Sequence, residues 1–518
     1  MTRPRTTALG FPPNGPLCVP LVLLVFSSLA MPLAAESPDS RDVRAHGATG
    51  DGLADDTAAV QGAIDACAAA GGTVVFPPGA YRCGTLYLRS RVHLFLDHGA
   101  TLLGSDNPED YAPFEKIDFR NDADPETSFF QRSLLFGDGI ERVAITGSGT
   151  IDANHVKRGG PKPIALKRCA FVEIRGIRIL NAPNYAISLL GTDNVNIDGV
   201  TILNAFADGI DPDSCRNVRV SNCHIESVDD AIVPKASFSL GERRACENIV
   251  VTNCVLSTVC NGFKLGTESG GGFRRIAVSN CVITGFKDHR PAISGIALES
   301  VDGGDLDGIV VSNIVMDRVR APVFIRLGNR GRDMGEPVPG TLRNVSVSNV
   351  VATRASLACS ITGLPYARVQ GVTLSDIRIH FIGGNPRQPD NEPVLELARV
   401  YPEAAMFGAM PAYGLYCRHV DDLALRNVVL DYADDFWRLT TDVYRDITWP
   451  ENGGMPSHAE PAEAGHALFC EDVRHLRIDG FRARPSRDGA PAVYLTEVLD
   501  VSMDAAATEQ ASGNVRAE

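Results

Sequence analysis

Aromatic residues and positive charge are both scarce in this sequence. Phe, Trp and Tyr make up 7% of the 518 residues, with 2 Trp, and the formal net charge is −14. The negative charge argues against a nucleic-acid partner, because phosphates would be repelled over most of the surface, and an acidic polysaccharide would need a local basic patch. The 44% of apolar residues excludes a disordered chain and is sufficient for a large core.

Long apolar runs are also missing, except near the N-terminus. Arg3 and Arg5 precede the apolar stretch Leu17–Ala30, and small residues stand before Glu36. This pattern is typical of a secretory signal peptide over residues 1–35, and an uncleaved membrane anchor is the alternative. We therefore expect a secreted or periplasmic protein, a monomer with no membrane contact after cleavage.

Cysteine usage fits export without demanding disulfides. Of the 13 cysteines, all but one follow residue 35, and an oxidising compartment would permit disulfides. Cys67 and Cys83 are candidates for one pair, which the sequence does not settle. Cys223, Cys254 and Cys281 share one sequence context, and we expect them to stack as small core residues.

The middle of the sequence repeats a short pattern. Val218–Cys223, Ile249–Cys254 and Ile276–Cys281 each have two alternating apolar residues, then Ser or Thr, Asn and Cys, and Ile309–Ile314 and Val345–Val350 continue the pattern. A short alternating strand, an Asn turn and another short strand are typical of one coil of a strand solenoid. These units contain no amphipathic helical stretch. We expect an all-β fold, a right-handed parallel β-helix from about residue 73 onward.

Stacked coils would place equivalent residues about 4.8 Å apart along the solenoid axis. The side-chain amides of the repeated Asn would then form a hydrogen-bonded ladder, which is a structural role. The expected members of the ladder are Asn222, Asn253, Asn280, Asn313 and Asn349.

A helix is expected to cap the N-terminal end of the solenoid. The helix-start signal Asp55–Thr57 precedes the helical stretch Ala58–Ala70, and two glycines follow it. We expect a single β-helix domain over residues 36–518, with an irregular insertion at about 433–465 that holds both tryptophans.

One group of acids departs from the repeat. Asp208 lies 21 residues before Asp229 and 22 before Asp230, about one coil, so the three side chains should stack on neighbouring coils. Carboxylates within roughly 5–10 Å repel one another, which should raise the pKa of at least one. A protonated acid beside an ionised base suits glycoside hydrolysis, and a calcium site is the alternative. Asp211 and Asp213 stand among turn-forming pairs and are expected to lie in turns.

Several segments resemble glycoside hydrolase family 28, the polygalacturonase family. They are Asp42–Ala48, Asp51–Thr57, Gly149–Asp152, Asn181–Tyr185 and Asp208–Cys215. The resemblance covers most of the chain after residue 35 and implies a hydrolase that needs no cofactor and no metal. It implies that Asp229 is the general acid, while Asp208 and Asp230 activate water in a single inverting displacement. Lys235 matches the lysine that follows the Asp pair in the family.

Two motifs of that family are altered. Its Gly-His-Gly segment is Cys260–Gly262 here, so Asn261 stands where the family has the histidine that supports the acid. Its Arg-Ile-Lys segment, which binds a galacturonate carboxylate, is Ala297–Glu299 here. A methyl group and the anion of Glu299 replace two cations, which argues against galacturonate at that position.

Other residues are candidates for substrate contact. Lys264 alternates with apolar neighbours and should point outward near the carboxylates, either to replace a missing cation or as a solvated surface lysine. His289 and Arg290 precede the altered motif. Tyr413 and Arg418 belong to a segment rich in Pro, Gly and Tyr that also resembles β-helix hydrolases, although core packing explains the tyrosine as well.

Together these features predict a glycosidase that cleaves a pectin-type polysaccharide by inverting hydrolysis, with a rhamnogalacturonan-like or other substrate favoured over plain polygalacturonate. A lyase or epimerase on the same fold is one alternative, with Lys235 or Lys264 as the base and calcium at the aspartates. A non-catalytic carbohydrate-binding β-helix is the other, and the three retained aspartates argue against it.

Overall fold

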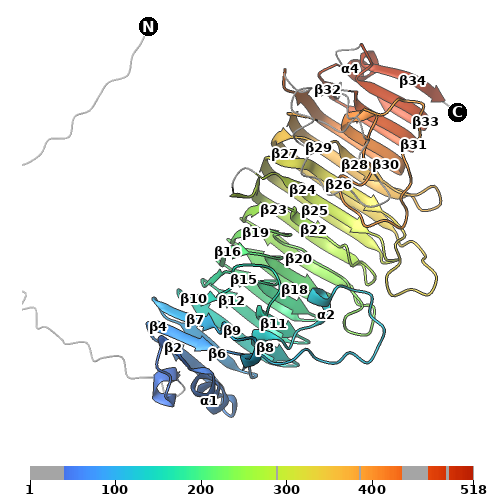
Figure 1. The fold of residues 1–518 in the computed structure, drawn as a ribbon. Helices are drawn as coiled ribbons and strands as arrows, with labels where there is room; N and C mark the ends of the chain where they lie inside the picture. The colour runs from blue at the N-terminus through green and yellow to red at the C-terminus, as the bar shows by residue number, and fades with distance from the viewer. Residues whose placement is uncertain (1–39, 288–289, 384–386, 435–464, 486–488, 517–518) are drawn as a thin grey trace, which may run out of the picture. The chain divides into compact units, whose positions relative to one another are not determined.

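The computed structural model describes residues 40–287, 290–383, 387–434, 465–485 and 489–516, which belong to one compact unit, Asp39–Glu518. Short parallel strands stack coil upon coil through this unit, from the blue to the red end of Figure 1. The predicted right-handed parallel β-helix is confirmed. The predicted signal peptide, His289, both tryptophans and most of the expected insertion lie outside the described residues.

The strands form three faces, and each coil adds one strand to a face. The first face consists of β1 (Ser40–Asp42), β3 (Gly72–Phe76), β6 (Val92–Leu96), β9 (Glu141–Gly147), β12 (Ala170–Arg175), β15 (Asp193–Asp198), β18 (Arg216–Ser221) and β20 (Cys246–Thr252). The second face consists of β2 (Asp51–Asp55), β4 (Gly79–Cys83), β7 (Ala100–Gly104), β10 (Thr150–Asp152), β13 (Arg178–Leu180), β16 (Thr201–Ala205), β19 (His224–Ser227) and β21 (Val255–Thr258).

The third face carries the residues of the candidate site. It consists of β5 (Leu86–Tyr87), β8 (Ser133–Asp138), β11 (Lys162–Lys167), β14 (Ile187–Leu190), β17 (Ile210–Asp213), β22 (Asn261–Leu265), β24 (Ala292–Ser300), β26 (Val319–Leu327) and β28 (Cys359–Thr362). Isolated bridges from Ile232 to Ile210 and to Phe263 connect β17 to β22 across the coil that holds Asp229 and Asp230.

Except for one strand of two residues, the later strands run through more than one face without a break. They are β23 (Phe273–Gly285), β25 (Leu306–Asp317), β27 (Leu342–Ala355), β29 (Val369–Phe381), β30 (Ala412–Tyr432), β31 (His466–Asp479), β32 (Arg482–Ala483), β33 (Val493–Met503) and β34 (Ala511–Arg516). The helical elements are η1 (Val43–His46), α1 (Thr57–Ala68), η2 (Pro108–Asp110), α2 (Pro125–Ser128) and α4 (Ala505–Glu509). Within the described residues, no helix is long and apolar enough to span a membrane.

The N-terminal end differs from the prediction in one respect. Helix α1 forms as expected, but the strands begin at Ser40 and not at about residue 73, because β1 pairs with β3 in parallel. Asp56, at the start of α1, accepts hydrogen bonds from the backbone of Thr49 and Gly50, at 2.6 and 3.0 Å. The Asp56 carboxylate thus connects the segment Thr49–Gly50 to the start of α1 through hydrogen bonds.

Apolar side chains fill the interior of the coils as one continuous core. Cys223, Cys254 and Cys281 are 1–2% exposed and stack within it, as predicted. No disulfide is present among the described residues, so the candidate pair Cys67 and Cys83 does not form one. Both are buried in the apolar core, where a thiol packs as a small hydrophobic group.

The Asn ladder is present with one irregular step. Asn349 donates to Asn313 at 2.8 Å and Asn313 donates to Asn280 at 3.0 Å, whereas Asn280 bonds Thr252 instead of Asn253. All five predicted Asn have φ between 50° and 57°. This is the left-handed region, which Asn tolerates better than most residues. The residue type is therefore explained by the backbone turn as much as by the ladder.

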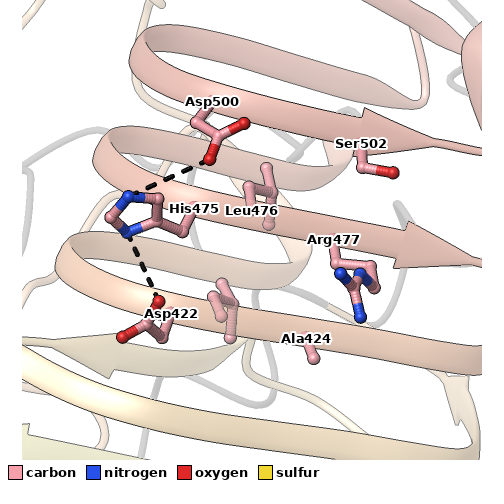
Figure 2. A pocket seen from close by; sticks show the side chains of 8 residues that line it. Asp422, Ala424, His475, Leu476, Arg477, Asp500 and Ser502 are labelled. Atoms are coloured by element: carbon pink, nitrogen blue, oxygen red, sulfur yellow. Dashed lines mark ion pairs between the residues drawn. The ribbon is translucent and has the colours of Figure 1, made fainter.

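A similar turn position on the last coils carries ionisable residues. His475 lies between Asp422 and Asp500, with nitrogen–oxygen distances of 3.3 and 3.9 Å (Figure 2). All three have positive φ, as the ladder Asn do. These stacked turns line a shallow hollow. The hollow lies on the last coils of the solenoid, far from the carboxylate cluster.

Candidate active site

Three carboxylates come together where the second face turns into the third. Asp208 lies between β16 and β17, and Asp229 and Asp230 follow β19 on the next coil. The backbone N–H of Asp230 donates to Oδ1 of Asp208 at 3.2 Å, and carboxylate oxygens of Asp229 and Asp230 lie within 4.8 Å of each other. The stacking predicted from the 21- and 22-residue spacings is thus present.

Lys235 neutralises one side of this cluster. Its Nζ donates to Asp208 at 2.8 Å and to Asp211 at 2.6 Å, and it lies 4.1 Å from the centre of the Tyr185 ring. All four residues are buried. Burial alone would lower the pKa of Lys235, but Asp208 and Asp211 outweigh it and hold that pKa well above its usual value.

Asn261 and Lys264 hold Asp230. Asn261, the first residue of β22, donates to Oδ1 of Asp230 from its backbone at 3.0 Å and from its side-chain amide at 2.6 Å. Lys264 lies 3.2 Å from the other oxygen and donates to the hydroxyl of Tyr401 at 3.5 Å. Lys264 is 4% exposed. Of the two predictions for this residue, the one that placed it beside the carboxylates is therefore confirmed, and it is not a solvated surface lysine.

Asp229 has a partner that the sequence did not reveal. Arg158, in the connection between β10 and β11, donates from Nη1 to Oδ2 of Asp229 at 2.5 Å. The other edge of its guanidinium binds Glu126 of α2, with Nε 3.0 Å from Oε1. Burial acts to raise the pKa of Asp229, but Arg158, together with Lys264 and Lys235, outweighs burial and holds that pKa below its usual value.

Asp208 has the opposite electrostatic environment. Burial raises its pKa well above the usual value, and the negative charges of Asp229 and Asp230 add to this, against the attraction of Lys235. The predicted upward shift is confirmed in direction, although burial and not repulsion is its larger cause. The cluster therefore combines one carboxylate with a raised pKa and one with a lowered pKa.

The turn prediction for Asp211 and Asp213 is wrong. Both lie on β17 and are 2% exposed. Asp211 binds Lys235, while Asp213 accepts from the backbone of Ser237 at 2.9 Å and from the Ser237 hydroxyl at 2.5 Å. Burial raises the pKa of Asp213 to about 6. Through Lys235 and Ser237, these two buried acids hold β17 to the next coil.

The altered Arg-Ile-Lys segment lies on β24, one coil beyond Asn261. Ala297 is fully buried in an apolar cluster with Phe324, Leu357 and Met406. Glu299 is 1% exposed, and its Oε2 has no hydrogen-bond partner among the described residues. Burial raises the pKa of Glu299 to about 8, even though Lys264 opposes the shift. The raised pKa favours the neutral form of Glu299, and neither Ala297 nor Glu299 supplies a cation here.

The contacts described for the remaining candidates are with residues other than the three carboxylates. Tyr413 is 2% exposed within the solenoid core, and its hydroxyl donates to the backbone of Arg484 at 3.1 Å, so the packing explanation accounts for it. Arg418 is held by the Val394 carbonyl at 2.5 Å and by Glu396 at 2.7 Å. Arg290 is exposed, with its guanidinium 5.3 Å from the ring centre of Phe286.

Tyr401 is a second residue that the sequence did not single out. It precedes the segment that packs near Ala297, and 47% of its surface is exposed. Lys264 and Arg330 lie 5.6 and 5.7 Å from its ring centre. An exposed aromatic ring beside buried cations offers an apolar surface on which a sugar can pack.

The alternatives of metal binding and lyase chemistry fit these residues poorly. Asp229, Asp230 and Cys260 offer ligand atoms within 4.8 Å of one another, but Arg158 and Lys264 already neutralise the two carboxylates. Burial and the same carboxylates raise the pKa of the Cys260 thiol, which disfavours the thiolate that binds metals. The two lysines proposed as lyase bases have raised pKa values and stay protonated.

Comparisons with known proteins agree with this geometry. A model of "Glycosyl hydrolases family 28" matches residues 122–395, more than half of the chain, and a model of "Rhamnogalacturonase A/epimerase, pectate lyase-like" matches residues 40–101. A probable polygalacturonase of Vitis vinifera is 26% identical over 374 residues, covering 66% of this chain and 74% of the relative. An exo-poly-alpha-D-galacturonosidase of Dickeya chrysanthemi is 27% identical over 399 residues, covering 63% of this chain and 64% of the relative.

Solved structures share the fold. An exopolygalacturonase from Thermotoga maritima superposes with a TM-score of 0.60 at 22% identity, covering 76% of this chain and 92% of that one. A family 28 exopolygalacturonase of Yersinia enterocolitica has a TM-score of 0.58 at 19% identity, with coverage of 77% and 79%. With the family model matched across the carboxylate cluster, this chain is a glycosidase and belongs to glycosyl hydrolase family 28.

Proposed function

We propose that this glycosidase hydrolyses a pectin-type polysaccharide with inversion at the anomeric carbon. The carrying observation is the set of three stacked carboxylates, Asp208, Asp229 and Asp230, which lie side by side where the second face turns into the third. In the proposed mechanism Asp229 donates a proton to the leaving oxygen, while Asp208 and Asp230 orient a water molecule. Lys235 donates to Asp208 at 2.8 Å and so stabilises the ionised form that Asp208 needs to accept a proton from that water.

The substrate is proposed to resemble rhamnogalacturonan more than plain polygalacturonate. Support comes from Ala297 and Glu299, which are buried and supply no cation at the position where the family's Arg-Lys pair would bind a galacturonate carboxylate. The match to a rhamnogalacturonase-type model over residues 40–101 and the relatives named as polygalacturonases both support a pectic substrate.

Product analysis tests this proposal. The protein is incubated with rhamnogalacturonan, polygalacturonate and a neutral glucan, each with and without a chelator, and the products are analysed by mass spectrometry. We expect products that gain one water, most from rhamnogalacturonan, and no effect of the chelator. Unsaturated products that need a divalent cation would contradict hydrolysis, and faster cleavage of polygalacturonate would contradict the substrate assignment.

Export is proposed on the charged and apolar pattern before residue 36. Expression of the full chain in a bacterial host and N-terminal sequencing of the soluble product test it. We expect a mature chain that begins near Glu36 outside the cytoplasm. An uncleaved chain in the membrane fraction would favour the anchor instead.

A further inference from the structure

Arg158 joins the candidate acid to the N-terminal half of the solenoid. It lies in the connection between β10 and β11, and its guanidinium has two engaged edges. Nε and Nη2 bind the carboxylate of Glu126, and Nη1 binds Asp229 at 2.5 Å. One edge is thus anchored to another segment, so the guanidinium stays in place if the contact with Asp229 breaks.

The contact with Asp229 conflicts with the role of a proton donor. A general acid must carry a proton before it reacts, whereas an arginine at hydrogen-bond distance stabilises the ionised carboxylate. In the free protein Arg158 keeps the pKa of Asp229 low against the effect of burial. The pair must therefore separate during each turnover, and some group must replace Asp229 on Nη1.

Arg158 is also the cation most open to a ligand. Among the described residues, three basic side chains pair with Asp208, Asp229 or Asp230, and they are Arg158, Lys235 and Lys264. The side chain of Arg158 is 47% exposed, against 6% for Lys235 and 5% for Lys264. The position of the family's Arg-Lys pair holds no cation, so an acidic sugar would meet its accessible positive charge at Arg158.

We propose that Arg158 binds the carboxylate of a uronate residue of the substrate, and that this exchange releases Asp229 to act as the proton donor. The inference rests on the proposed hydrolytic function and adds a binding residue to it. Arg158 comes from coils before the carboxylates, whereas Ala297 and Glu299 come from a coil after them. A uronate on the first side and a neutral sugar on the other match an alternating polysaccharide.

The exchange balances without any further reactant. The uronate carboxylate accepts the Nη1 hydrogen bond in place of Asp229, and Asp229 takes a proton from solvent. As the glycosidic bond breaks, that proton moves to the leaving oxygen, and water forms the new bond to the anomeric carbon while Asp208 or Asp230 takes its proton. After the products leave, Asp208 or Asp230 releases its proton to solvent and ionised Asp229 returns to Arg158, so the net change is the addition of one water.

A binding experiment tests the uronate contact without relying on turnover. An oligosaccharide of alternating rhamnose and galacturonate, and the same oligosaccharide with its carboxyl groups reduced to alcohols, are titrated into Asp229→Asn protein by calorimetry. We expect at least tenfold tighter binding of the acidic oligosaccharide, and loss of that difference in Arg158→Gln. Arg158→Lys should keep part of it, because a point charge remains.

A matched control comes from another half-exposed arginine. Arg354 is 50% exposed and binds both carboxylate oxygens of Asp317 through Nε and Nη2, away from the carboxylate cluster. Arg354→Gln should keep the full preference for the acidic oligosaccharide. An unchanged preference in Arg158→Gln, or no preference in the starting protein, overturns the uronate contact.

The pH dependence tests the release of Asp229. In the wild type the fall of kcat/KM with rising pH reports Asp229 paired with Arg158, and the fall of kcat reports Asp229 after release. We expect kcat to fall at a higher pH than kcat/KM, and the two profiles to coincide in Arg158→Gln, with kcat/KM shifted to higher pH. Coincident profiles in the wild type overturn the release.

The outcomes separate this inference from the proposed function. Hydrolysis by the wild type together with unchanged discrimination in Arg158→Gln contradicts the inference alone. Discrimination between the two oligosaccharides without any product that gains water contradicts the hydrolytic function and leaves Arg158 as a binding residue. Circular dichroism of each variant confirms that loss of binding does not come from loss of the fold.

Discussion

Asn261 binds one oxygen of Asp230 twice, through its backbone N–H at 3.0 Å and its side-chain amide at 2.6 Å. In the resembling family a histidine stands at this position. An amide does not titrate, so Asn261 holds Asp230 in the same orientation at every pH. The substitution therefore retains a hydrogen-bond donor at the cluster and gives up a group that can change its charge.

Asn261→Ala should lower kcat about tenfold or more with little change in KM, because the water-orienting carboxylate of Asp230 loses its side-chain amide donor. Asn261→His should recover part of kcat and introduce a new step in the pH profile. Steady-state kinetics across pH measure both effects. An Asn261→Ala variant with wild-type kcat would contradict the role of this contact.

Asp229→Asn and Asp230→Asn should each lower activity by roughly 10²–10⁴, the usual contribution of a general acid or base. Their costs in stability should differ. The ion pair of Asp229 with half-exposed Arg158 should contribute under about 1 kcal/mol to the free energy of unfolding, so Asp229→Asn should cost little. Asp230→Asn should cost more, because it leaves buried Lys264 without its carboxylate. Hydrolysis rates and urea unfolding measure the two effects. Near-native rates in either variant would exclude the assigned role.

Lys235→Met should destabilise the protein by about 3–5 kcal/mol, because it leaves Asp208 and Asp211 buried beside each other without a cation. Adding Asp211→Asn to this variant should recover part of the loss, since one of the two negative charges is removed. Urea unfolding of the single and double variants tests this. A loss below about 1 kcal/mol would mean that solvent or a proton neutralises the pair at little cost.

Glu299 should make the stability of the protein depend on pH. Its pKa is about 8 in the folded protein and 4.5 in an unfolded chain. Between these values the folded protein retains a proton that the unfolded chain has released, so this contribution is complete below pH 4.5 and is lost as the pH rises through 8. Glu299→Gln should be more stable than the wild type by a few kcal/mol at pH 8 and nearly equal to it at pH 4.5. Equal unfolding curves at pH 8 would show that Glu299 is not buried as described.

The fold was predictable because each coil repeats local information. Two alternating apolar residues and an Asn that tolerates positive φ define a strand and its turn, and stacking then follows from pairing each strand with its copy. The vertical order Asp208, Asp230, Asn261 follows directly from the coil length. The early start at Ser40 was not predictable from the repeat, because β1 and β2 lack its Asn turn.

Contacts between loops account for what the sequence did not indicate. Arg158 meets Asp229 from 71 residues away, and Tyr401 meets Lys264 from 137 residues away, with no periodic spacing to connect them. Asp211 was expected in a turn because Asp-Pro pairs favour one, but the strand pairing of β17 with β14 overrides that local preference. Tyr413 was predicted to contact substrate because of the residues around it in the sequence, but its side chain on β30 packs in the core.

The configuration of the first product tests the account most directly. Hydrolysis of a rhamnogalacturonan oligosaccharide is followed by proton NMR at early times, before the freed anomeric centre equilibrates. The stacked carboxylates predict that the new reducing end appears with the configuration opposite to that of the bond cleaved, and that Asp229→Asn yields no such signal. A first product with retained configuration, or an unsaturated one, would contradict the roles assigned to Asp208, Asp229 and Asp230.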